Sequence, residues 1–229
     1  MAGADALGAV RREWQRRVEA EYHSAVVTHH LTAWLLQITA PLELIRLGLS
    51  IVDDELAHAE LSQAVYASAG GSEAARLSRS MLGASQASSD LERSIARVGL
   101  ASFCLGETVA VRLFARLREG CEEPVARAAL DRILKDEVKH REFGWTLLEW
   151  QLNTDAESAV RRLATEELPG MLARLRENYG STSAGAADEV TPPARRWGLM
   201  SAPEYAAAVH DSIERDIAPR FAELGIELR

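Results

Sequence analysis

The chain is poor in cysteine and lacks the segments that are typical of strands. Its 229 residues include two cysteines, Cys104 and Cys121, which are too few for a disulfide framework. Regularly spaced, Val- and Ile-rich segments of alternating polarity, which a sheet requires, are absent. Hydrophobic residues nevertheless make up 47% of the chain, enough for a substantial core. These features predict an all-α fold with reduced thiols.

Positive charge and long apolar runs are also scarce. The formal net charge of −8 gives no electrostatic footprint for nucleic acid. The start of the sequence, MAGADALGAVRREW, lacks a basic segment followed by an apolar core. No apolar run approaches the roughly 20 residues of a membrane span. We therefore expect a soluble, cytoplasmic protein with no nucleic-acid partner and no membrane association.

Proline and glycine divide the first two thirds of the chain into expected helices. Pro41 and Pro124 stand where helices can begin, and Gly70 and Gly120 stand where helices can end. Between Gly70 and the third helix lies a Ser- and Ala-rich connection, residues 72–89. The four expected helices are residues 11–39, 42–69, 90–119 and 124–153. Two antiparallel hairpins joined by a long crossover form one class of four-helix bundle.

Two additional helices are expected at the C-terminal end. The first covers residues 155–179 and is interrupted by Pro169-Gly170, and the second covers residues 203–224. A Gly-, Ser- and Ala-rich loop at residues 180–193 separates them.

The chain length fits a single domain. At 229 residues it lies at the upper end of what one compact domain usually holds. We expect one domain over residues 1–229, with the four-helix bundle at residues 11–153 and a C-terminal helical extension at residues 155–229.

One short motif occurs twice. Residues 53–60 read DDELAHAE and residues 135–142 read KDEVKHRE, in a chain with only six histidines. Side chains three residues apart on a helix point the same way. Each motif therefore presents one carboxylate and one imidazole to a common point, in the pairs Glu55 with His58 and Glu137 with His140.

Both pairs lie on the apolar stripe of their expected helix. In the second helix the stripe comprises Ile45, Gly48, Val52, Glu55, Ala59 and Ser62. In the fourth helix it comprises Leu130, Ile133, Glu137, His140, Gly144 and Leu147. Burial of an unpaired carboxylate is costly, and metal coordination offsets that cost. The pattern therefore favours a metal site over exposed ion pairs such as Glu137 with Arg141.

The other two helices each offer one further acid. The third helix has an apolar stripe interrupted only by Glu107, and antiparallel packing brings Glu107 to the height of Glu137. The same reasoning on the first hairpin places Glu21 close to Glu55. The stripe of the third helix comprises Ala96, Leu100, Phe103, Glu107, Val111, Phe114 and Leu117. The alternatives to Glu21 on the first helix are Glu19, His23 and His29.

From Glu13 to Asn153 the sequence resembles the ferritin-like superfamily of dinuclear-metal carboxylate proteins, in which two helices each supply a Glu and two supply Glu-x-x-His. The resemblance implies a ferritin-like four-helix bundle. For Asp54 and Asp136 it implies a hydrogen bond to a ligand histidine, which fixes the imidazole tautomer. The implied metal ligands, which would also carry the catalysis, are Glu21, Glu55, His58, Glu107, Glu137 and His140.

The ligand set indicates the metal and the chemistry. Hard oxygen donors with two imidazoles suit iron or manganese better than zinc. The resemblance implies two metal ions, Fe/Fe with Mn/Fe as the alternative, and O₂ as co-substrate. We expect a non-haem oxygenase or oxidase that oxidises a small organic substrate, because the C-terminal helices can cover a substrate pocket. The layout is loosely similar to that of aldehyde-deformylating oxygenases, and an external electron donor is compatible with it.

Two other interpretations remain open. The first is a ferroxidase or iron-handling protein without an organic substrate, which predicts a large symmetric cage. The oxygenase interpretation predicts a monomer or homodimer instead. The second is a metal-free scaffold that has kept the bundle, against which the complete ligand set argues.

Overall fold

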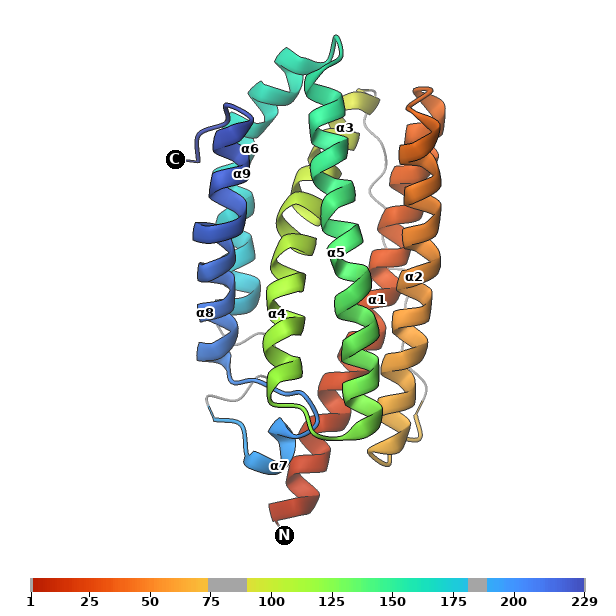
Figure 1. Ribbon diagram of the computed structural model, residues 1–229, viewed down its shortest axis with the longest axis vertical. Helices are drawn as coiled ribbons and strands as arrows, with labels where there is room; N and C mark the ends of the chain where they lie inside the picture. Colours follow the sequence, from red (N-terminus) through yellow and green to blue (C-terminus); the bar gives the residue numbers. More distant parts are fainter. Residues whose placement is uncertain (1, 74–89, 181–188, 229) are drawn as a thin grey trace.

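The computed structural model describes residues 2–73, 90–180 and 189–228, and within these residues every regular element is a helix (Figure 1). The expectation of an all-α fold is confirmed. In chain order the elements are α1 (Ala2–Gln37), α2 (Leu42–Ser68), α3 (Leu91–Val98), η1 (Gly99–Glu107), α4 (Thr108–Glu119), α5 (Pro124–Leu152), α6 (Glu157–Gly180), α7 (Pro192–Arg195), α8 (Ala202–Ser212), η2 (Ile213–Ile217) and α9 (Ala218–Glu223).

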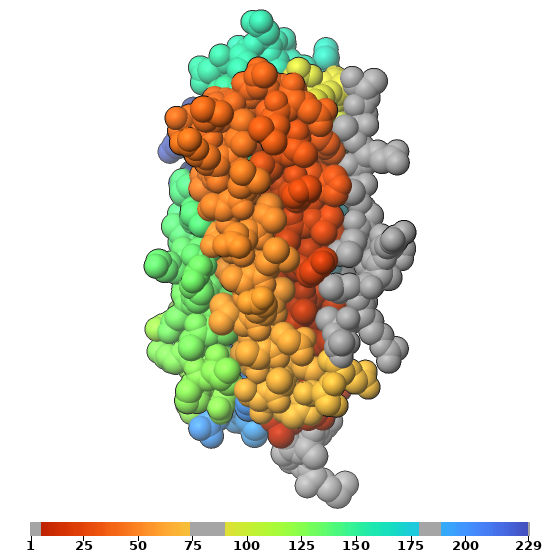
Figure 2. All heavy atoms as spheres, turned by 90° about the vertical axis from the view of Figure 1, so that its right-hand side faces the viewer, coloured from red at the N-terminus to blue at the C-terminus, as the bar shows by residue number. Residues whose placement is uncertain are grey.

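Four long helical segments lie side by side in the part of the chain that the structure describes. They are α1, α2, the continuous run α3–η1–α4, and α5 (Figure 1). Short turns make α1 with α2, and α4 with α5, antiparallel neighbours. Pro41 precedes α2 and Pro124 begins α5, as expected from the rigid φ of proline. Figure 2 shows α1 and α2 side by side on one face of the molecule.

The expected crossover at residues 72–89 lies almost wholly outside the described residues, as does most of the expected loop at residues 180–193. The end of that loop forms the short helix α7. At the other end of the chain, α1 begins at Ala2 and not at residue 11. Ala6 and Val10 are buried in the core, so packing extends the helix beyond the residues predicted from the apolar spacing.

The expected break at Pro169-Gly170 is wrong, because α6 continues through both residues. A proline inside a helix removes one backbone hydrogen bond. Here Pro169 is exposed, whereas the neighbouring Leu168 and Met171 are buried in the core. Packing on both sides of the proline therefore holds the helix together.

The third expected helix contains a π-helical stretch, η1, which the apolar pattern did not indicate. The wider turn changes which residues face the core. Beyond Glu107 the buried positions are Thr108, Val109, Leu113 and Leu117. Of the predicted stripe, Leu117 is buried, whereas Val111 and Phe114 are only partly buried. π-Helical turns occur frequently at functional sites. This one ends at a candidate metal ligand, Glu107.

The run Leu91–Glu119 has the length and apolar composition of a membrane span, contrary to the expectation that no segment would approach that length. Half of its most apolar window is buried inside the protein. The run contacts α5, α6 and α8. An apolar helix of this kind is also what the interior of a helical bundle requires.

Two glycines allow close contact between helices. A Cβ on Gly48 would collide with the Thr32 hydroxyl of α1. A Cβ on Gly144 would lie 2.7 Å from the backbone carbon of Phe103 and 2.9 Å from the backbone nitrogen of Cys104. The Cys104 thiol donates to the Gly144 carbonyl over 3.3 Å at the same contact. Gly144 thus lets η1 approach α5 at the height of the candidate site.

Candidate metal centre

Six acidic and imidazole side chains meet in the interior between the four long segments. None of the six is more than 8% exposed. Along α1 and α2 they lie between two apolar clusters, one around Trp14 and Val65 and the other around Leu31 and Ile51. The six are Glu21 of α1, Glu55 and His58 of α2, Glu107 of η1, and Glu137 and His140 of α5.

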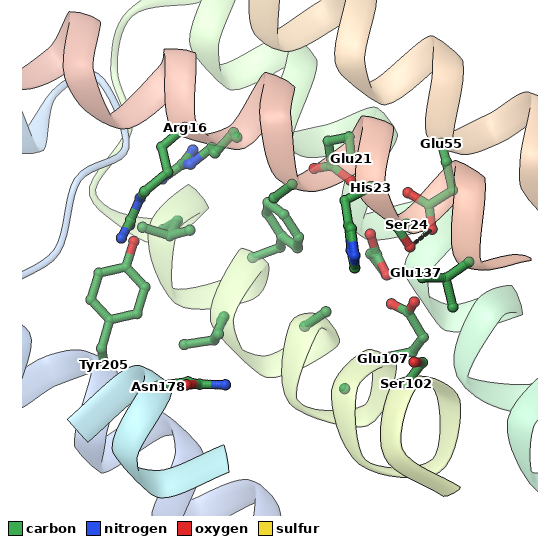
Figure 3. Close-up of a pocket in the computed structure, with 18 of the residues that line it drawn as sticks. Arg16, Glu21, His23, Ser24, Glu55, Ser102, Glu107, Glu137, Asn178 and Tyr205 are labelled. Carbon is green, nitrogen blue, oxygen red and sulfur yellow. Dashed lines mark hydrogen bonds between the residues drawn. The ribbon is translucent and has the colours of Figure 1, made fainter. Parts of the chain in front are cut away.

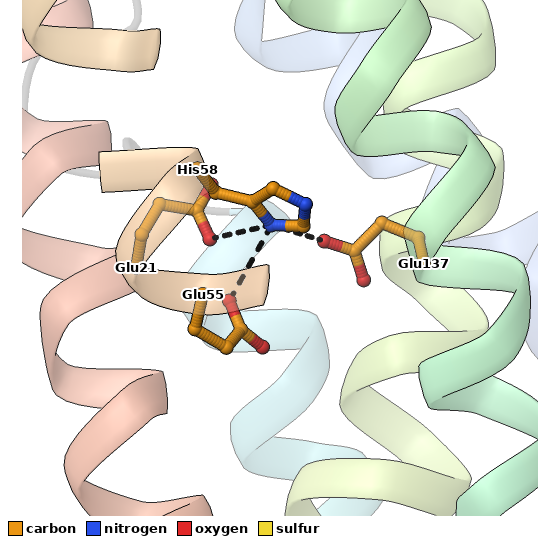
Figure 4. A group of neighbouring side chains, drawn as sticks. All are labelled: Glu21, Glu55, His58 and Glu137. Carbon is orange, nitrogen blue, oxygen red and sulfur yellow. Dashed lines mark ion pairs between the residues drawn. The ribbon is translucent and has the colours of Figure 1, made fainter. Parts of the chain in front are cut away.

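Three of these side chains, Glu21, Glu55 and Glu137, surround the Nδ1 atom of the fourth, His58 (Figure 4). One donor atom from each of Glu21, Glu55, His58 and Glu137 lies within 4.8 Å of every other. From His58 Nδ1, the nearest oxygens of Glu21, Glu55 and Glu137 lie 3.8, 3.6 and 3.8 Å away. These separations leave space for a cation between the four donors.

A second group of donors adjoins the first. Glu55, Glu107 and His140 also offer atoms that lie within 4.8 Å of one another. His140 Nδ1 is 3.4 Å from Glu55 Oε1 and 3.7 Å from Glu137 Oε2. Glu55 belongs to both groups, and Glu137 directs one oxygen toward each histidine.

The two motifs exchange hydrogen bonds across the α2–α5 interface. His58 Nε2 lies 3.2 Å from Asp136 Oδ2, and His140 Nε2 lies 3.4 Å from Asp54 Oδ2. An ionised carboxylate only accepts, so the hydrogen-bond network assigns the imidazole proton to Nε2 in both rings. The lone pair of each Nδ1 is then directed at the glutamates.

Cations at the edge of the bundle form ion pairs with both aspartates. Arg132 donates to Asp136 and to Asp54, and Lys139 donates to Asp54 and to the Ser50 hydroxyl. Burial raises the pKa of Asp136, but the hydrogen bonds from Arg132 and His58 outweigh burial and lower it. Asp136 can therefore act as a hydrogen-bond acceptor for His58 at neutral pH.

Four buried atoms of the cluster have no hydrogen-bond partner among the described residues. They are Glu55 Oε2, His58 Nδ1, Glu137 Oε2 and His140 Nδ1. A buried polar group without a partner costs about 1–3 kcal/mol, and more when it is charged. All four carry lone pairs, so another hydrogen-bond acceptor could not satisfy them. The donor set fits a metal cation, or protons where the metal is missing.

The pKa shifts of the metal-free cluster agree with that requirement. Burial raises the pKa of Glu21 to about 7 and that of Glu137 to about 8, and it raises the pKa of Glu107 well above its usual value. For His58, burial lowers the pKa, but Glu21 and Glu55 outweigh burial and raise it to about 11. Burial also raises the pKa of Glu55, yet contacts with both histidines bring it down to about 2. Without a metal, the cluster retains protons.

None of the alternatives to Glu21 belongs to a donor group. Glu19 is partly buried and His29 is exposed, and neither belongs to a donor group. The exposed His23 lines the adjoining cavity but does not belong to a donor group either.

Sequence reasoning missed Ser24. Its hydroxyl donates to Glu55 Oε1 over 2.9 Å. Ser24 follows Glu21 by three residues, so both lie on one face of α1, and that spacing is the signal that could have identified it. The bond links the first helix to the shared carboxylate.

A cavity of about 430 Å³ adjoins the cluster (Figure 3). Glu21, Glu55, Glu107 and Glu137 form part of its wall at one end. The middle of the wall is mainly apolar, and the remaining wall is polar. The apolar residues are Ala20, Val27, Gly106, Ala110, Leu113, Phe114 and Leu117.

Comparisons with known proteins give no functional assignment. No family model, no curated protein and no solved structure matches this chain. A functional interpretation therefore depends on the buried Glu/His cluster, which can hold a metal ion, and on the cavity beside it.

Proposed function

We propose that the chain is a dinuclear-metal oxidoreductase with a ferritin-like four-helix bundle, and that it uses O₂ to oxidise a small organic substrate. One observation carries the proposal. Four buried lone-pair atoms without partners, from two carboxylates and two imidazoles, converge between two donor groups that share Glu55. A structural role would leave these atoms unsatisfied, whereas two cations would satisfy all of them.

The donor groups would divide the ligands between two metal ions. Glu21 and His58 would hold one ion, and Glu107 and His140 would hold the other. Glu55, together with Glu137, would lie between the two. Four carboxylates provide hard, anionic donors, which suit two iron ions or a manganese and an iron ion.

When bound, a pair of reduced iron ions supplies the two electrons that O₂ activation requires. The residues of the chain supply geometry and a dry environment. Asp136 and Asp54 hold the Nε2 protons, so that the Nδ1 atoms of His58 and His140 stay available as ligands. The Ser24 hydroxyl orients the shared carboxylate of Glu55.

The cavity favours an organic substrate over iron oxidation alone. A ferroxidase needs a path for hydrated iron ions, and such a path is lined by polar and acidic groups. Here the wall beyond the cluster is mainly apolar and includes Ala110, Leu113 and Phe114. Mostly apolar pockets with a few polar groups are typical of small-molecule sites.

Oxygen uptake tests the proposal. Protein loaded anaerobically with Fe(II) is mixed with O₂, and uptake is followed for the wild type, Glu107→Ala and Glu149→Ala. Glu149 is exposed on α5 and lies outside the cluster, so its variant is the matched control. We expect uptake limited to the bound iron in the wild type and control, and strongly reduced uptake in Glu107→Ala. Sustained oxidation of a large excess of Fe(II) would instead support an iron-handling protein, and equal uptake in all three proteins would refute the site.

A further inference from the structure

We propose that the cavity binds an organic anion, with its apolar body along α4 and its charged group beside Arg16. The other end of the ligand would then face the metal cluster. This orientation toward a metal rests on the proposed function, whereas the binding of an anion does not. The cavity has two chemically different ends (Figure 3). The carboxylate cluster lies at one end, and Arg16, Asn178 and Tyr205 lie at the other.

The end of the cavity away from the cluster contains two guanidinium groups. Arg16 and Arg17 share one carboxylate, Glu13, over 2.6 and 3.3 Å. The Tyr205 hydroxyl donates to the same carboxylate over 3.2 Å. Two guanidinium groups therefore lie beside one carboxylate, and Nη1 of the buried Arg17 has no hydrogen-bond partner among the described residues.

The two arginines differ in accessibility. Arg17 is buried, donates to the Gly198 carbonyl over 2.9 Å and lies over the ring of Trp14. The side chain of Arg16 is 36% exposed and lines the cavity. A ligand in the cavity can therefore reach Arg16, and a guanidinium group favours a carboxylate or another oxyanion.

The length of the cavity limits the size of the ligand. Both Glu107 and Leu117 line it, and the helical rise between them is roughly 15 Å. An extended chain of about a dozen covalent bonds spans that distance. Between the ends, Ala110 and Phe114 provide apolar wall, which favours a hydrocarbon or aromatic body over a sugar or a peptide.

Isothermal titration calorimetry with decanoate, decan-1-ol and decylamine tests this proposal, with the metal content of every sample measured in parallel. We expect decanoate to bind about tenfold or more tightly than the other two compounds, which corresponds to the contribution of one charge-assisted contact. Arg16→Gln should remove this preference. Arg12→Gln, which removes an exposed charge of the same helix that does not line the cavity, should keep it.

A second experiment fills the cavity with a larger side chain. Ala110→Trp should abolish decanoate binding. If Ala110→Trp does not fold, Ala110→Leu takes its place and should weaken decanoate binding. Equal binding of all three compounds, or equal effects of Arg16→Gln and Arg12→Gln, would overturn the proposal. Because metal content is measured separately, loss of the anion preference in metal-replete protein refutes only the ligand class. Loss of metal with intact decanoate binding refutes only the proposed function.

An independent observation concerns the outer face of α2. Leu42, Leu49 and Leu56 are 63%, 52% and 40% exposed, and they recur every seven residues. Residues at this spacing form one stripe along a helix. Arg46 and Asp53 are exposed on the same stripe, and within the described residues neither forms an ion pair. Figure 2 shows α2 along the surface of the molecule.

The order of these five residues fits an antiparallel contact with a second copy of the chain. A two-fold axis beside Leu49 would place Leu42 against Leu56 of the other copy. It would also place Arg46 against the opposite Asp53, twice in the interface. An interface around such an axis uses the same patch on both copies. We infer that the protein forms a homodimer through α2.

Charge exchange tests this interface without disturbing the core. In sedimentation velocity experiments we expect a dimer for the wild type and about tenfold weaker association for Arg46→Asp or Asp53→Arg alone. The variant with both substitutions should recover the dimer, because it restores opposite charges across the axis. Arg162→Asp, an exposed charge change on α6, is the control.

Leu49→Asp should give a monomer. A monomeric wild type at tens of micromolar concentration, or a dimer that none of these α2 substitutions weakens, would overturn the inference. A higher assembly that survives the α2 substitutions would show that copies associate through another face.

Discussion

The imidazole of His58 donates from Nε2 to Asp136 Oδ2 over 3.2 Å, although the two residues belong to different copies of the repeated motif. The reciprocal contact joins His140 to Asp54 over 3.4 Å. Each motif therefore provides one imidazole to the cluster and one carboxylate that orients the imidazole of the other motif. The exchange ties α2 to α5, so the two halves of the site are held by the same interface that buries them.

Asp136→Asn tests the role of that carboxylate. An amide can also donate, so the variant no longer fixes the Nε2 proton of His58, and we expect metal affinity to fall by about 10–100-fold with helix content unchanged. Competition with a metal chelator measures the affinity. Asp131→Asn on the same helix, outside the cluster, should leave it unchanged. Equal affinities for both variants would contradict the role assigned to Asp136.

The stability of the metal-free protein should fall as the pH rises from about 5 to about 8. In the folded chain the pKa of Glu21 rises to about 7, that of Glu137 to about 8 and that of His58 to about 11. A group with a raised pKa stabilises the fold fully below its unfolded pKa, and this contribution is lost as the pH rises through the folded value. Glu55, with its pKa lowered to about 2, contributes above its unfolded pKa and loses this contribution as the pH falls toward 2.

Urea unfolding of chelator-treated protein across this pH range measures the effect. Added Mn(II) should stabilise the protein more at pH 8 than at pH 5, because the cation then replaces protons that the cluster has lost. Glu137→Gln removes one of the titrating groups and should flatten the profile. A free energy of unfolding that increases from pH 5 to pH 8 without metal would be inconsistent with the buried cluster.

Gly144→Ala should destabilise the fold by about 1–3 kcal/mol, because the new Cβ meets the backbone of Phe103 and Cys104 and η1 must move away from α5. Gly170→Ala is the matched control in α6. Nothing lies closer than 3.5 Å to a Cβ at that position, so the exchange should stabilise the helix by about 1 kcal/mol. Thermal unfolding of both variants checks the opposite signs. Two effects of the same sign would argue against close contact between η1 and α5.

The sequence predicted the helices and the six clustered side chains because both depend on helical periodicity. Glu55 and Glu137 interrupt apolar stripes, and the hairpin turns then determine which acids lie at the same height. Pro169 misled the interpretation, because tertiary packing around Leu168 and Met171 outweighs a local helix breaker.

Other features depend on information that periodicity does not contain. The stretch η1 is a change in backbone hydrogen bonding, and only the three-dimensional structure shows how it alters the positions that follow Glu107. The pairing of Asp54 with His140, and of Asp136 with His58, can be predicted only if α2 and α5 are known to be neighbours. The bond from Ser24 to Glu55 likewise depends on the rotation of α1 about its axis.

Metal content per chain is the most direct measurement of the central claim. Protein is purified without chelators from cells supplied with iron and manganese, and is analysed by inductively coupled plasma mass spectrometry beside Glu137→Ala and Glu149→Ala. We expect about two equivalents of iron, or of iron plus manganese, in the wild type and in Glu149→Ala, and a clear loss in Glu137→Ala. Wild-type protein that binds neither metal, even after anaerobic reconstitution, would contradict the assignment of the buried cluster as a metal centre.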